Sequence, residues 1–517
     1  MTVITPTTTG PIYLRNLCAP FFDNSRRHPQ NPALVFDDRP ISNADMISQI
    51  DFTIDALQGC GIKPGDRVAY LGWNHPMLLI TLLATARMGA IFLPLNPRSS
   101  DVEANHILND CAASAVIAGP EFQPLIDGIR KDLPCEVYLG IEKGSTDWTV
   151  LNSGEIEGSD GISRHPIKQT LTDDVAVLLY TSGTTGRPKG VMITHGNVWS
   201  HSLNLRLQLN LHSQTTLLAM APMFHIGSLA MALAAIVVGG KVVVLSAFDT
   251  STVYRAITTW NVSLTFGVPT MLQALEHHPM FSTTDISNVT VIVGGSPVPV
   301  SMLETWSRMG VRIQQVYGMT EGGGSMLDAD KGLEKIGSAG LPLPLNEIEL
   351  RTIDTGQVIN VSDKDGQIWM RGPTITKGYW NLPEETVEAF DEDRWLASGD
   401  VGRWDSDGYL YIVDRIKDMI ISGGVNVYPA EVEKVLSDHP GIVSAAVIGL
   451  PDNKWGERVT AVIVTETSQS LSADEVIEFC QQSLSGYKVP RQVEFTTSLP
   501  EGPTGKVLKR ELRSKYI

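Results

Sequence analysis

The sequence has few of the features that mark secreted, membrane-spanning or nucleic-acid-binding proteins. Its five cysteines are scattered and include no C-x-x-C pair, so neither a zinc site nor a disulfide framework is indicated. The formal net charge of −17 argues against broad attachment to nucleic acid or anionic membranes. The most lipid-like run, residues 226–238, is shorter than the roughly 20 apolar residues that span a bilayer, and the N-terminus has no signal-like region. We therefore expect a cytoplasmic protein with no transmembrane segment and no nucleic-acid partner.

The composition supports a large folded core. Hydrophobic residues make up 43% of the 517 residues, a length that exceeds one ordinary domain of roughly 100 to 200 residues. Short β-rich runs alternate with helical patterns from residue 65 to 118, and strand-like runs recur at 175–180, 241–245 and 289–293. This alternation predicts βαβ units in a mostly parallel sheet. Ligands bind such sheets at the carboxyl ends of the strands.

The pattern changes in the last third of the chain. Residues 366–370, 378–380 and 407–411 are typical of antiparallel strands joined by glycine-containing turns. After these, Pro429 and Ser472 are typical of helix starts, and strand-like runs surround both helices. The predicted fold class is therefore α/β, with a large N-terminal multi-sheet α/β domain over residues 1–414 and a small C-terminal α+β domain over residues 415–517.

The strongest chemical signal is the segment YTSGTTGRPKG at residues 180–190. Its glycines let backbone N–H groups approach phosphate oxygens, its hydroxyls add donors, and Lys189 adds a positive charge. The order differs from a Walker A loop, because Pro188 precedes the lysine and Gly190 follows it. The segment therefore predicts a polyphosphate-binding loop of another kind.

This segment resembles the phosphate-binding signature of the adenylate-forming superfamily, which includes acyl-CoA synthetases, aryl-CoA ligases, luciferases and peptide-synthetase adenylation domains. Further segments match in the order of the family, so the resemblance covers nearly the whole chain. They are VYGMTE at 316–321, SGD at 398–400, DRIKDMIISGG at 414–424, NVYPAE at 426–431 and PTGK at 503–506. The C-terminal run is most similar to bacterial fatty acyl-CoA synthetases and their relatives in secondary metabolism, although Val425 stands where those often have Glu.

The resemblance implies an ATP site. Tyr317 is expected to pack on the adenine, and Glu321 to ligate Mg²⁺, which favours a carboxylate together with phosphate oxygens and water. Asp400 is expected to accept hydrogen bonds from the ribose hydroxyls, with Arg415 as a second contact. Outside these motifs, a turn Asp and a surface ion pair would be the ordinary interpretations. The implied ATP- and AMP-binding residues are Thr181, Ser182, Gly183, Thr184, Thr185, Gly186, Lys189, Gly295, Ser296, Pro297, Tyr317, Gly318, Thr320, Asp400 and Arg415.

The resemblance also implies a mobile C-terminal domain. Lys506 is expected to reach the carboxylate and the α-phosphate, where its charge stabilises the transition state of adenylation. Lys417 stands at the hinge position, and Gly423 and Gly424 are expected to leave room for a thin thiol arm after domain rotation. The implied catalytic residues are Lys189, Thr320, Glu321 and Lys506.

The acyl pocket has a weaker signature. The segment PMFHIG at 222–227 resembles the family segment that closes over the acid, although a lone His among apolar residues is more often part of the core. We expect an apolar, roomy pocket suited to an apolar and bulky acid. Its predicted lining is His225, Gly267, Gly318 and Met319.

The sequence thus predicts an acyl-CoA synthetase, an acid–thiol ligase that uses ATP and Mg²⁺ to form acyl-AMP and then a thioester with CoA. The alternative is a stand-alone adenylating enzyme that delivers acyl-AMP to a carrier-protein thiol or a partner enzyme. Retention of Lys189, Glu321, Asp400 and Lys506 argues against a third interpretation, a nucleotide-binding regulator without chemistry. Since relatives in the superfamily are often dimers, a homodimer is also expected.

Overall fold

The computed structural model describes residues 16–144, 147–151, 161–182, 187–296, 298–465, 471–501 and 507–517. The chain falls into two compact units: residues 1–347 with 370–396, and residues 348–369 with 397–517. The predicted domain boundary at 414/415 lies inside the second unit and stays a prediction.

The larger sheet of the first unit has nine strands in the order β16-β15-β14-β13-β12-β10-β11-β1-β2. Its central strands are parallel, and antiparallel strands extend it at both edges. The strands are β1 (Pro32–Phe36), β2 (Arg39–Ser42), β10 (Thr216–Ala219), β11 (Lys241–Val244), β12 (Leu264–Gly267), β13 (Thr290–Gly294), β14 (Arg312–Met319), β15 (Gly322–Met326) and β16 (Leu341–Pro342).

The second sheet of this unit has seven strands in the order β7-β6-β5-β3-β4-β8-β9, and only β9 runs antiparallel to its neighbour. The mostly parallel α/β architecture predicted from the alternating pattern is confirmed. The strands are β3 (Arg67–Leu71), β4 (Ile91–Leu95), β5 (Ala115–Ala118), β6 (Val137–Gly140), β7 (Thr149–Val150), β8 (Val175–Ser182) and β9 (Pro188–Thr194).

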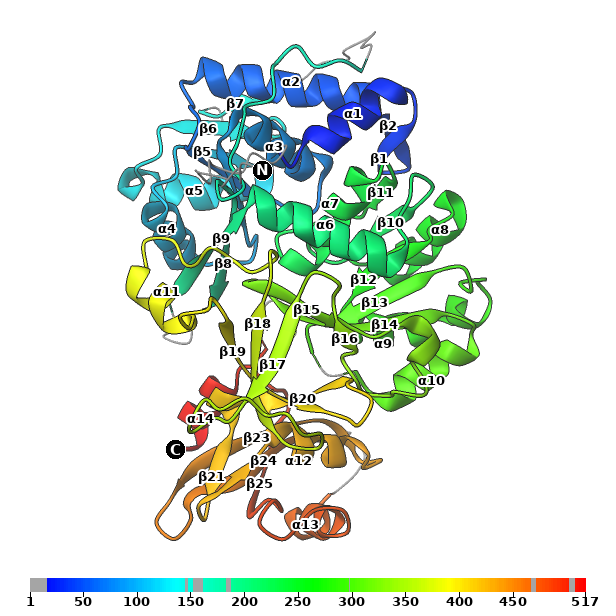
Figure 1. Ribbon diagram of the computed structural model, residues 1–517, viewed down its shortest axis with the longest axis vertical. Coiled ribbons are helices and arrows are strands. Elements are labelled where there is room, and N and C mark those ends of the chain that lie inside the picture. The colour runs from blue at the N-terminus through cyan, green and yellow to red at the C-terminus, as the bar shows by residue number, and fades with distance from the viewer. Residues whose placement is uncertain are drawn as a thin grey trace, which may run out of the picture. The chain divides into compact units, whose positions relative to one another are not determined.

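Helices cover both sheets (Figure 1). The largest hydrophobic core joins residues of α2, α3 and α7 to residues of both sheets, so these helices lie between them. Two further cores fill the outer faces, with α8 to α10 on the larger sheet and α4 and α5 on the smaller one. The helices are α1 (Ala19–Arg27), α2 (Asn43–Gly59), α3 (Pro76–Met88), α4 (Asp101–Asp110), α5 (Gln123–Ile129), α6 (His195–Leu209), α7 (Ile226–Val237), α8 (Thr250–Trp260), α9 (Pro269–Glu276), α10 (Val300–Arg308) and α11 (Pro383–Ala389).

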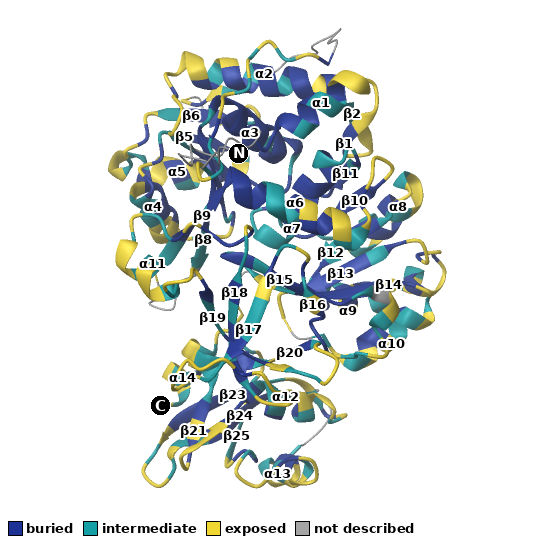
Figure 2. Ribbon diagram, viewed as in Figure 1, coloured by how far each residue is buried: buried dark blue, intermediate teal, exposed yellow. Residues whose placement is uncertain are grey.

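The lipid-like run found in the sequence forms α7, a buried helix of 12 residues whose apolar side chains face the core on most sides (Figure 2). Among the described residues, no helix combines the length and the apolar character that crossing a membrane requires. The run is therefore explained by burial between two sheets, and the cytoplasmic location stays a prediction.

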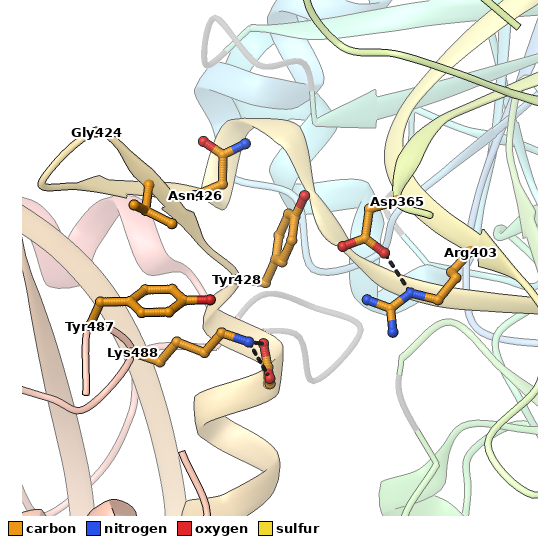
Figure 3. Close-up of a pocket in the computed structure, with 9 residues that line it drawn as sticks. Asp365, Arg403, Gly424, Asn426, Tyr428, Tyr487 and Lys488 are labelled. Carbon is orange, nitrogen blue, oxygen red and sulfur yellow. Dashed lines mark hydrogen bonds and ion pairs between the residues drawn. The ribbon is translucent and has the colours of Figure 1, made fainter. Parts of the chain in front are cut away.

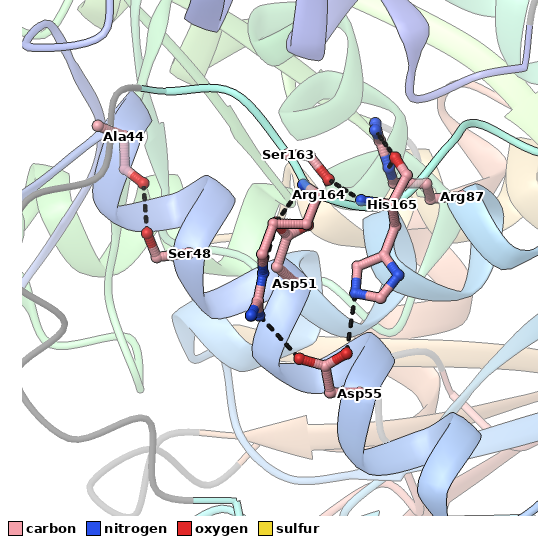
Figure 4. A network of polar contacts seen from close by, with 8 residues as sticks. All are labelled: Ala44, Ser48, Asp51, Asp55, Arg87, Ser163, Arg164 and His165. Carbon is pink, nitrogen blue, oxygen red and sulfur yellow. Dashed lines mark hydrogen bonds and ion pairs between the residues drawn. The ribbon is translucent and has the colours of Figure 1, made fainter.

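A polar network attaches residues 163–165 to α2 (Figure 4). The backbone N–H of Arg164 donates to the buried carboxylate of Asp51 at 2.8 Å, and the Arg164 guanidinium lies 2.7 Å from Asp55. The ring of His165 lies 3.0 Å from the second oxygen of Asp55, and the Nε of Arg87 donates to the His165 carbonyl at 2.8 Å. The segment that precedes β8 is thereby fixed to the core of the first unit.

The second unit contains nearly all of a four-stranded sheet, in the order β17-β18-β19-β20, and a five-stranded sheet in which β22-β21-β24-β23 is extended by β25. A separate hydrophobic core lies between the five-stranded sheet and the helices α12 and α13. The elements are β17 (Glu347–Arg351), β18 (Gly366–Arg371), β19 (Leu396–Trp404), β20 (Leu410–Arg415), β21 (Ile420–Ser422), β22 (Val425–Val427), α12 (Pro429–Ser437), β23 (Ile442–Asp452), β24 (Gly456–Thr465), α13 (Ala473–Gln481), β25 (Gln492–Phe495) and α14 (Lys509–Tyr516).

Local signals in the sequence account for most of these elements, and one prediction is wrong. Ser472 caps α13 in a capping box with Glu475, as its position predicted. Residues 378–380, expected as a strand, instead form a single bridge in which Tyr379 lies opposite Val191 of β9. The aromatic pair after Gly378 resembles a strand in the sequence, but its backbone bonds to β9 at a few positions without forming a continuous ladder.

Candidate functional site

The predicted ligand-binding residues of the first unit gather at one edge of the nine-stranded sheet. Strands β10, β12, β13 and β14 are mutually parallel, so their carboxyl ends meet at the same edge. The predicted residues at these ends come from four connections. They are His225 after β10, Gly267 at the end of β12, Gly295 and Ser296 after β13, and Tyr317, Gly318, Met319, Thr320 and Glu321 at the end of β14.

Glu321 lies in the tight connection between β14 and β15 and is only 8% exposed. Its carbonyl accepts a hydrogen bond from the Thr376 backbone at 2.7 Å, and its Oε1 accepts one from the Tyr379 hydroxyl at 2.9 Å. Burial beside this carboxylate raises the pKa of Tyr379 above its ordinary value, so the hydroxyl keeps its proton and continues to donate. The backbone and the carboxylate of Glu321 are thus each held by a hydrogen bond.

Tyr379 also links Glu321 to the phosphate loop. The Lys189 Nζ lies 5.5 Å from the centre of the Tyr379 ring, within the range of a cation–π contact. The backbone on each side of Tyr379 is bonded to β9, since Met192 N–H donates to Gly378 at 3.0 Å and Trp380 N–H donates to Gly190 at 2.7 Å. The sequence did not assign a site role to Tyr379, because only the tertiary structure places it between the two motifs.

The phosphate loop connects the antiparallel strands β8 and β9. Thr181 lies opposite Lys189 in this hairpin, and Ser182 lies opposite Pro188. The Tyr180 hydroxyl donates to Asp110 at 2.5 Å, which anchors the base of the hairpin to α4. Several predicted residues lie outside the described part of the chain. They are Gly183, Thr184, Thr185 and Gly186 of this loop, Pro297, and the catalytic candidate Lys506.

His225 precedes the first turn of α7, and its ring centre lies 4.2 Å from that of Phe224. Burial lowers the pKa of His225 to about 4, so the ring is neutral at physiological pH. Its Nε2 is buried and has no hydrogen-bond partner among the described residues. On the same turn, a side chain at Gly227 would meet the Phe266 ring at 2.7 Å, so this glycine lets the ring pack against the helix. The rings of Phe224, His225 and Phe266 therefore lie around the start of α7.

The second unit brings together Asp400 and Arg415, which the sequence also predicted as nucleotide contacts. They lie opposite each other on β19 and β20, and the Arg415 Nε is 3.3 Å from the Asp400 Oδ1. The hydroxyl of Ser398 accepts from the Asp400 backbone at 3.0 Å and donates to the Ile368 carbonyl at 2.8 Å. The hydrogen bonds of Ser398 in the SGD motif thus fix the position of Asp400 and its carboxylate.

The hinge candidate Lys417 lies in the 3₁₀ turn (Ile416–Asp418) between β20 and β21. Gly423 and Gly424 form the tight turn from β21 to β22, with φ angles of 62° and 78° that favour glycine. A side chain at Gly423 would lie 3.0 Å from the Trp455 ring, so the glycine permits close packing there. Gly424 borders a cavity of about 510 Å³ (Figure 3).

The cavity beside Gly424 is polar and carries balanced charge. Arg403 is 2.7 Å from Asp365, and Lys488 contacts both oxygens of Glu431 at 2.6 and 2.7 Å (Figure 3). Each cation that lines the cavity therefore has a carboxylate partner.

Comparison with known proteins identifies the family. A model of the AMP-binding enzyme family matches residues 21–380, and a model of the AMP-binding enzyme C-terminal domain matches residues 431–506. The chain belongs to the AMP-binding enzyme family. It is 40% identical to a feruloyl-CoA synthase of Amycolatopsis over 95% of this chain and 97% of that protein. It is 36% identical to the long-chain fatty acid–CoA ligase FadD13 of Mycobacterium tuberculosis, over 89% and 90%.

A solved structure supports the same assignment for this AMP-binding enzyme. ATP-bound MatB of Rhodopseudomonas palustris matches with a TM-score of 0.88 and 30% identity, over 97% of this chain and 98% of that one. The predicted resemblance to the adenylate-forming superfamily and the predicted fold class are confirmed. The AMP-binding enzyme is an AMP-forming acid–thiol ligase that uses ATP, Mg²⁺ and CoA.

The side chains around Glu321 fit a magnesium ion that is bound together with a nucleotide. Within the described ranges, no three His, Cys, Asp or Glu side chains form a cluster that would hold a metal alone. Mg²⁺ commonly takes one or two carboxylates and completes its shell with phosphate oxygens and water. Bound there, the ion would neutralise phosphate charge during adenylation. Glu321 would hold the ion, and its hydrogen bond from Tyr379 would keep the carboxylate in place.

Substituting Tyr379 by Phe in the AMP-binding enzyme tests this positioning. The variant keeps the ring against Lys189 but removes the hydrogen bond to Glu321, so we expect about a tenfold loss of ATP–pyrophosphate exchange. A rise in the Mg²⁺ concentration needed for half-maximal exchange should accompany the loss. Tyr409→Phe is the matched control, because this tyrosine lies in a turn of the second unit. An unchanged Mg²⁺ requirement in Tyr379→Phe would contradict the positioning role.

Proposed function

We propose that this enzyme activates an aromatic carboxylic acid as its acyl-AMP and transfers the acyl group to CoA. The observation that carries the choice of acid is the group of rings at the start of α7, formed by Phe224, His225 and Phe266. All three residues have intermediate exposure and so lie at the boundary of the core. Aromatic side chains favour offset or edge contacts with another ring, which an aryl acid offers and an alkyl chain does not.

Two further observations support an aryl acid. His225 is neutral, and its neighbours Met223 and Ile226 are apolar, so these three described residues offer no charge to an amino acid or a second carboxylate. The Amycolatopsis relative, which the chain matches over nearly its full length, is named for an aryl thioester.

We assign the chemical steps to residues as follows. The phosphate loop with Lys189 holds the β- and γ-phosphates, and Tyr317 packs on the adenine. Glu321, fixed by Tyr379, would hold Mg²⁺, which would neutralise phosphate charge, and Asp400 accepts hydrogen bonds from the ribose hydroxyls. The acid carboxylate attacks the α-phosphorus, the bond to the bridging oxygen breaks, and pyrophosphate leaves. Lys506 neutralises the charge that this attack concentrates.

In the second step the CoA thiolate attacks the acyl carbonyl carbon and AMP leaves with the bonding pair. At Gly424, in the turn from β21 to β22, no atom lies within 4 Å of the position that a side chain would take, which leaves room for a thin thiol arm, whereas the Trp455 ring fills that space at Gly423. A carrier-protein thiol is the alternative acceptor of the acyl group, and its thiol arm would also have to pass this turn. The homodimer stays a prediction, which light scattering of the purified protein would measure.

A panel of acids tests the proposed substrate class. We expect hydroxycinnamic and cinnamic acids to give kcat/KM values at least about tenfold above those of octanoic and hexadecanoic acids, because the ring contacts favour them. The measurement follows AMP and acyl-CoA formation with ATP, Mg²⁺ and CoA.

Two results would contradict parts of this proposal separately. A preference for hexadecanoic acid over every aryl acid would exclude the aromatic substrate class. ATP–pyrophosphate exchange with an aryl acid, but no acyl-CoA, would keep the first step and indicate a different acceptor. Reactions with Phe224→Leu, which removes one ring but keeps an apolar side chain, should lower kcat/KM for aryl acids and leave that for octanoic acid nearly unchanged.

A further inference from the structure

Thr376 is a buried polar residue that bonds to two elements of the proposed ATP site in the first unit. It is only 1% exposed. Its backbone N–H donates to the Glu321 carbonyl at 2.7 Å, and its hydroxyl donates to the Met192 carbonyl of β9, also at 2.7 Å. One residue therefore joins the connection that contains Glu321 to the strand that carries Lys189.

The hydroxyl of Thr376 is bonded both as a donor and as an acceptor. The Met192 carbonyl is the nearest acceptor for its proton, with the Gly378 carbonyl at 3.1 Å, and the Gly378 N–H donates to the hydroxyl oxygen at 3.1 Å. An apolar side chain of the same shape would remove this partner from the buried Gly378 N–H, which is unfavourable. The hydroxyl therefore ties the backbone just before Tyr379 to β9.

The same segment is held independently on the N-terminal side of Thr376. The side chain of Asn197, in the first turn of α6, donates to the Pro373 carbonyl at 2.9 Å and to the Ile375 carbonyl at 2.8 Å. These bonds do not involve the Thr376 hydroxyl. Its removal should therefore move the residues that follow Thr376 and leave the segment before it in place.

Two routes lead from Thr376 to Glu321. The backbone bond fixes the main chain of Glu321 directly. The hydroxyl fixes Gly378, and the next residue, Tyr379, donates to the Glu321 carboxylate at 2.9 Å. The Tyr379 ring centre also lies 5.5 Å from the Nζ of Lys189. A shift of this segment would therefore change how Glu321 and Lys189, the two charged groups assigned to the triphosphate, lie relative to each other.

We propose that Thr376 is a positioning residue for adenylation, whose hydroxyl holds β9 and Glu321 in a fixed relation so that both can act on one triphosphate. This inference rests on the proposed function, since it takes Glu321 as the Mg²⁺ ligand and Lys189 as a phosphate contact. It does not depend on which acid the enzyme activates. A group held in advance by such bonds needs no rearrangement when the charge of the transition state develops.

Thr376→Val tests this role, because it keeps the shape and the backbone N–H but removes the hydroxyl. Isothermal titration calorimetry without any acid measures nucleotide binding directly. We expect the affinity for ATP with Mg²⁺ to fall by about tenfold, and the affinity for AMP, which has no β- and γ-phosphates, to stay unchanged. In ATP–pyrophosphate exchange the KM for ATP should rise and the KM for the acid should not. Thr376→Ser keeps the hydroxyl and should restore both values.

Thr53→Val is the matched control. It removes a buried hydroxyl that donates to the Gln49 carbonyl at 2.8 Å, on α2, which carries none of the predicted site residues. Thermal unfolding shows whether each variant is folded, and Thr376→Ala takes the place of Thr376→Val if the valine does not fit.

Three results would overturn this inference. The first is an unchanged affinity for ATP with Mg²⁺ in Thr376→Val. The second is an equal loss of ATP and AMP affinity, which would show a merely structural role. The third is a loss in Thr376→Ser as large as that in Thr376→Val. Failure of the proposed function is seen separately: a wild-type enzyme that gives no ATP–pyrophosphate exchange with any acid contradicts adenylation itself, and a preference for fatty acids contradicts only the aromatic substrate class.

Discussion

Replacing Glu321 by Gln is expected to lower the rate of acyl-AMP formation by at least about a hundredfold, the usual scale for losing one preorganised charge contact in a transition state. Gln has the same shape as Glu and can still accept the Tyr379 hydrogen bond, so the connection between β14 and β15 should keep its structure. What the variant loses is the negative charge that Mg²⁺ requires in addition to phosphate oxygens.

ATP–pyrophosphate exchange over a range of Mg²⁺ concentrations measures this effect. The half-maximal Mg²⁺ concentration should rise, and the thermal unfolding temperature should change little. Glu304→Gln on the exposed face of α10 is the matched control, since it removes one negative charge from the same unit away from the site. Near-normal exchange at low Mg²⁺ in Glu321→Gln would show that another group holds the ion.

Replacing Lys506 by Ala is expected to separate the two half-reactions. Adenylation should fall by at least about a hundredfold, because attack of a carboxylate on a phosphate brings two negative groups together and needs a positioned cation. The second step has no such requirement, so CoA should still convert acyl-AMP to acyl-CoA at a rate near that of the wild-type enzyme. Chemically prepared acyl-AMP, added with CoA and without ATP, measures the second step alone.

Lys515→Ala provides the comparison for Lys506→Ala. It removes an exposed lysine from the same C-terminal region, and both half-reactions should be unaffected. The nearer Lys509 is unsuitable, because its Nζ lies 2.7 Å from the largely buried Glu433 and its loss would disturb the fold. If Lys506→Ala slowed both half-reactions equally, the assignment of Lys506 to adenylation would be wrong.

Features that depend on neighbouring residues in the sequence were predictable. The run from Ala115 to Ala118 forms a strand with those same bounds, because four consecutive apolar residues between turns match a strand buried on both faces. The helix after Ser472 begins where its cap predicts. It ends at Gln481, where the polar residues that follow give no sharp stop signal.

Features that depend on contacts between distant segments were not predictable from one sequence. Tyr379 acquires its role only because residues 376–380 bond to both β9 and Glu321, which lie far apart in the chain. The family motifs identified the chemistry, whereas the groups that hold and select the substrate required coordinates.

The three glycines of β15 have a consequence for altering this enzyme. Each one yields its side-chain space to a residue from a different segment: Gly322 to Ile375, Gly323 to His201 and Gly324 to Tyr317. An alanine at one position would therefore displace a single neighbour, with contacts of 2.4, 2.8 and 2.7 Å respectively. A mutant library confined to these three codons would therefore sample, one at a time, changes beside Ile375, beside His201 of α6 and beside Tyr317 of β14.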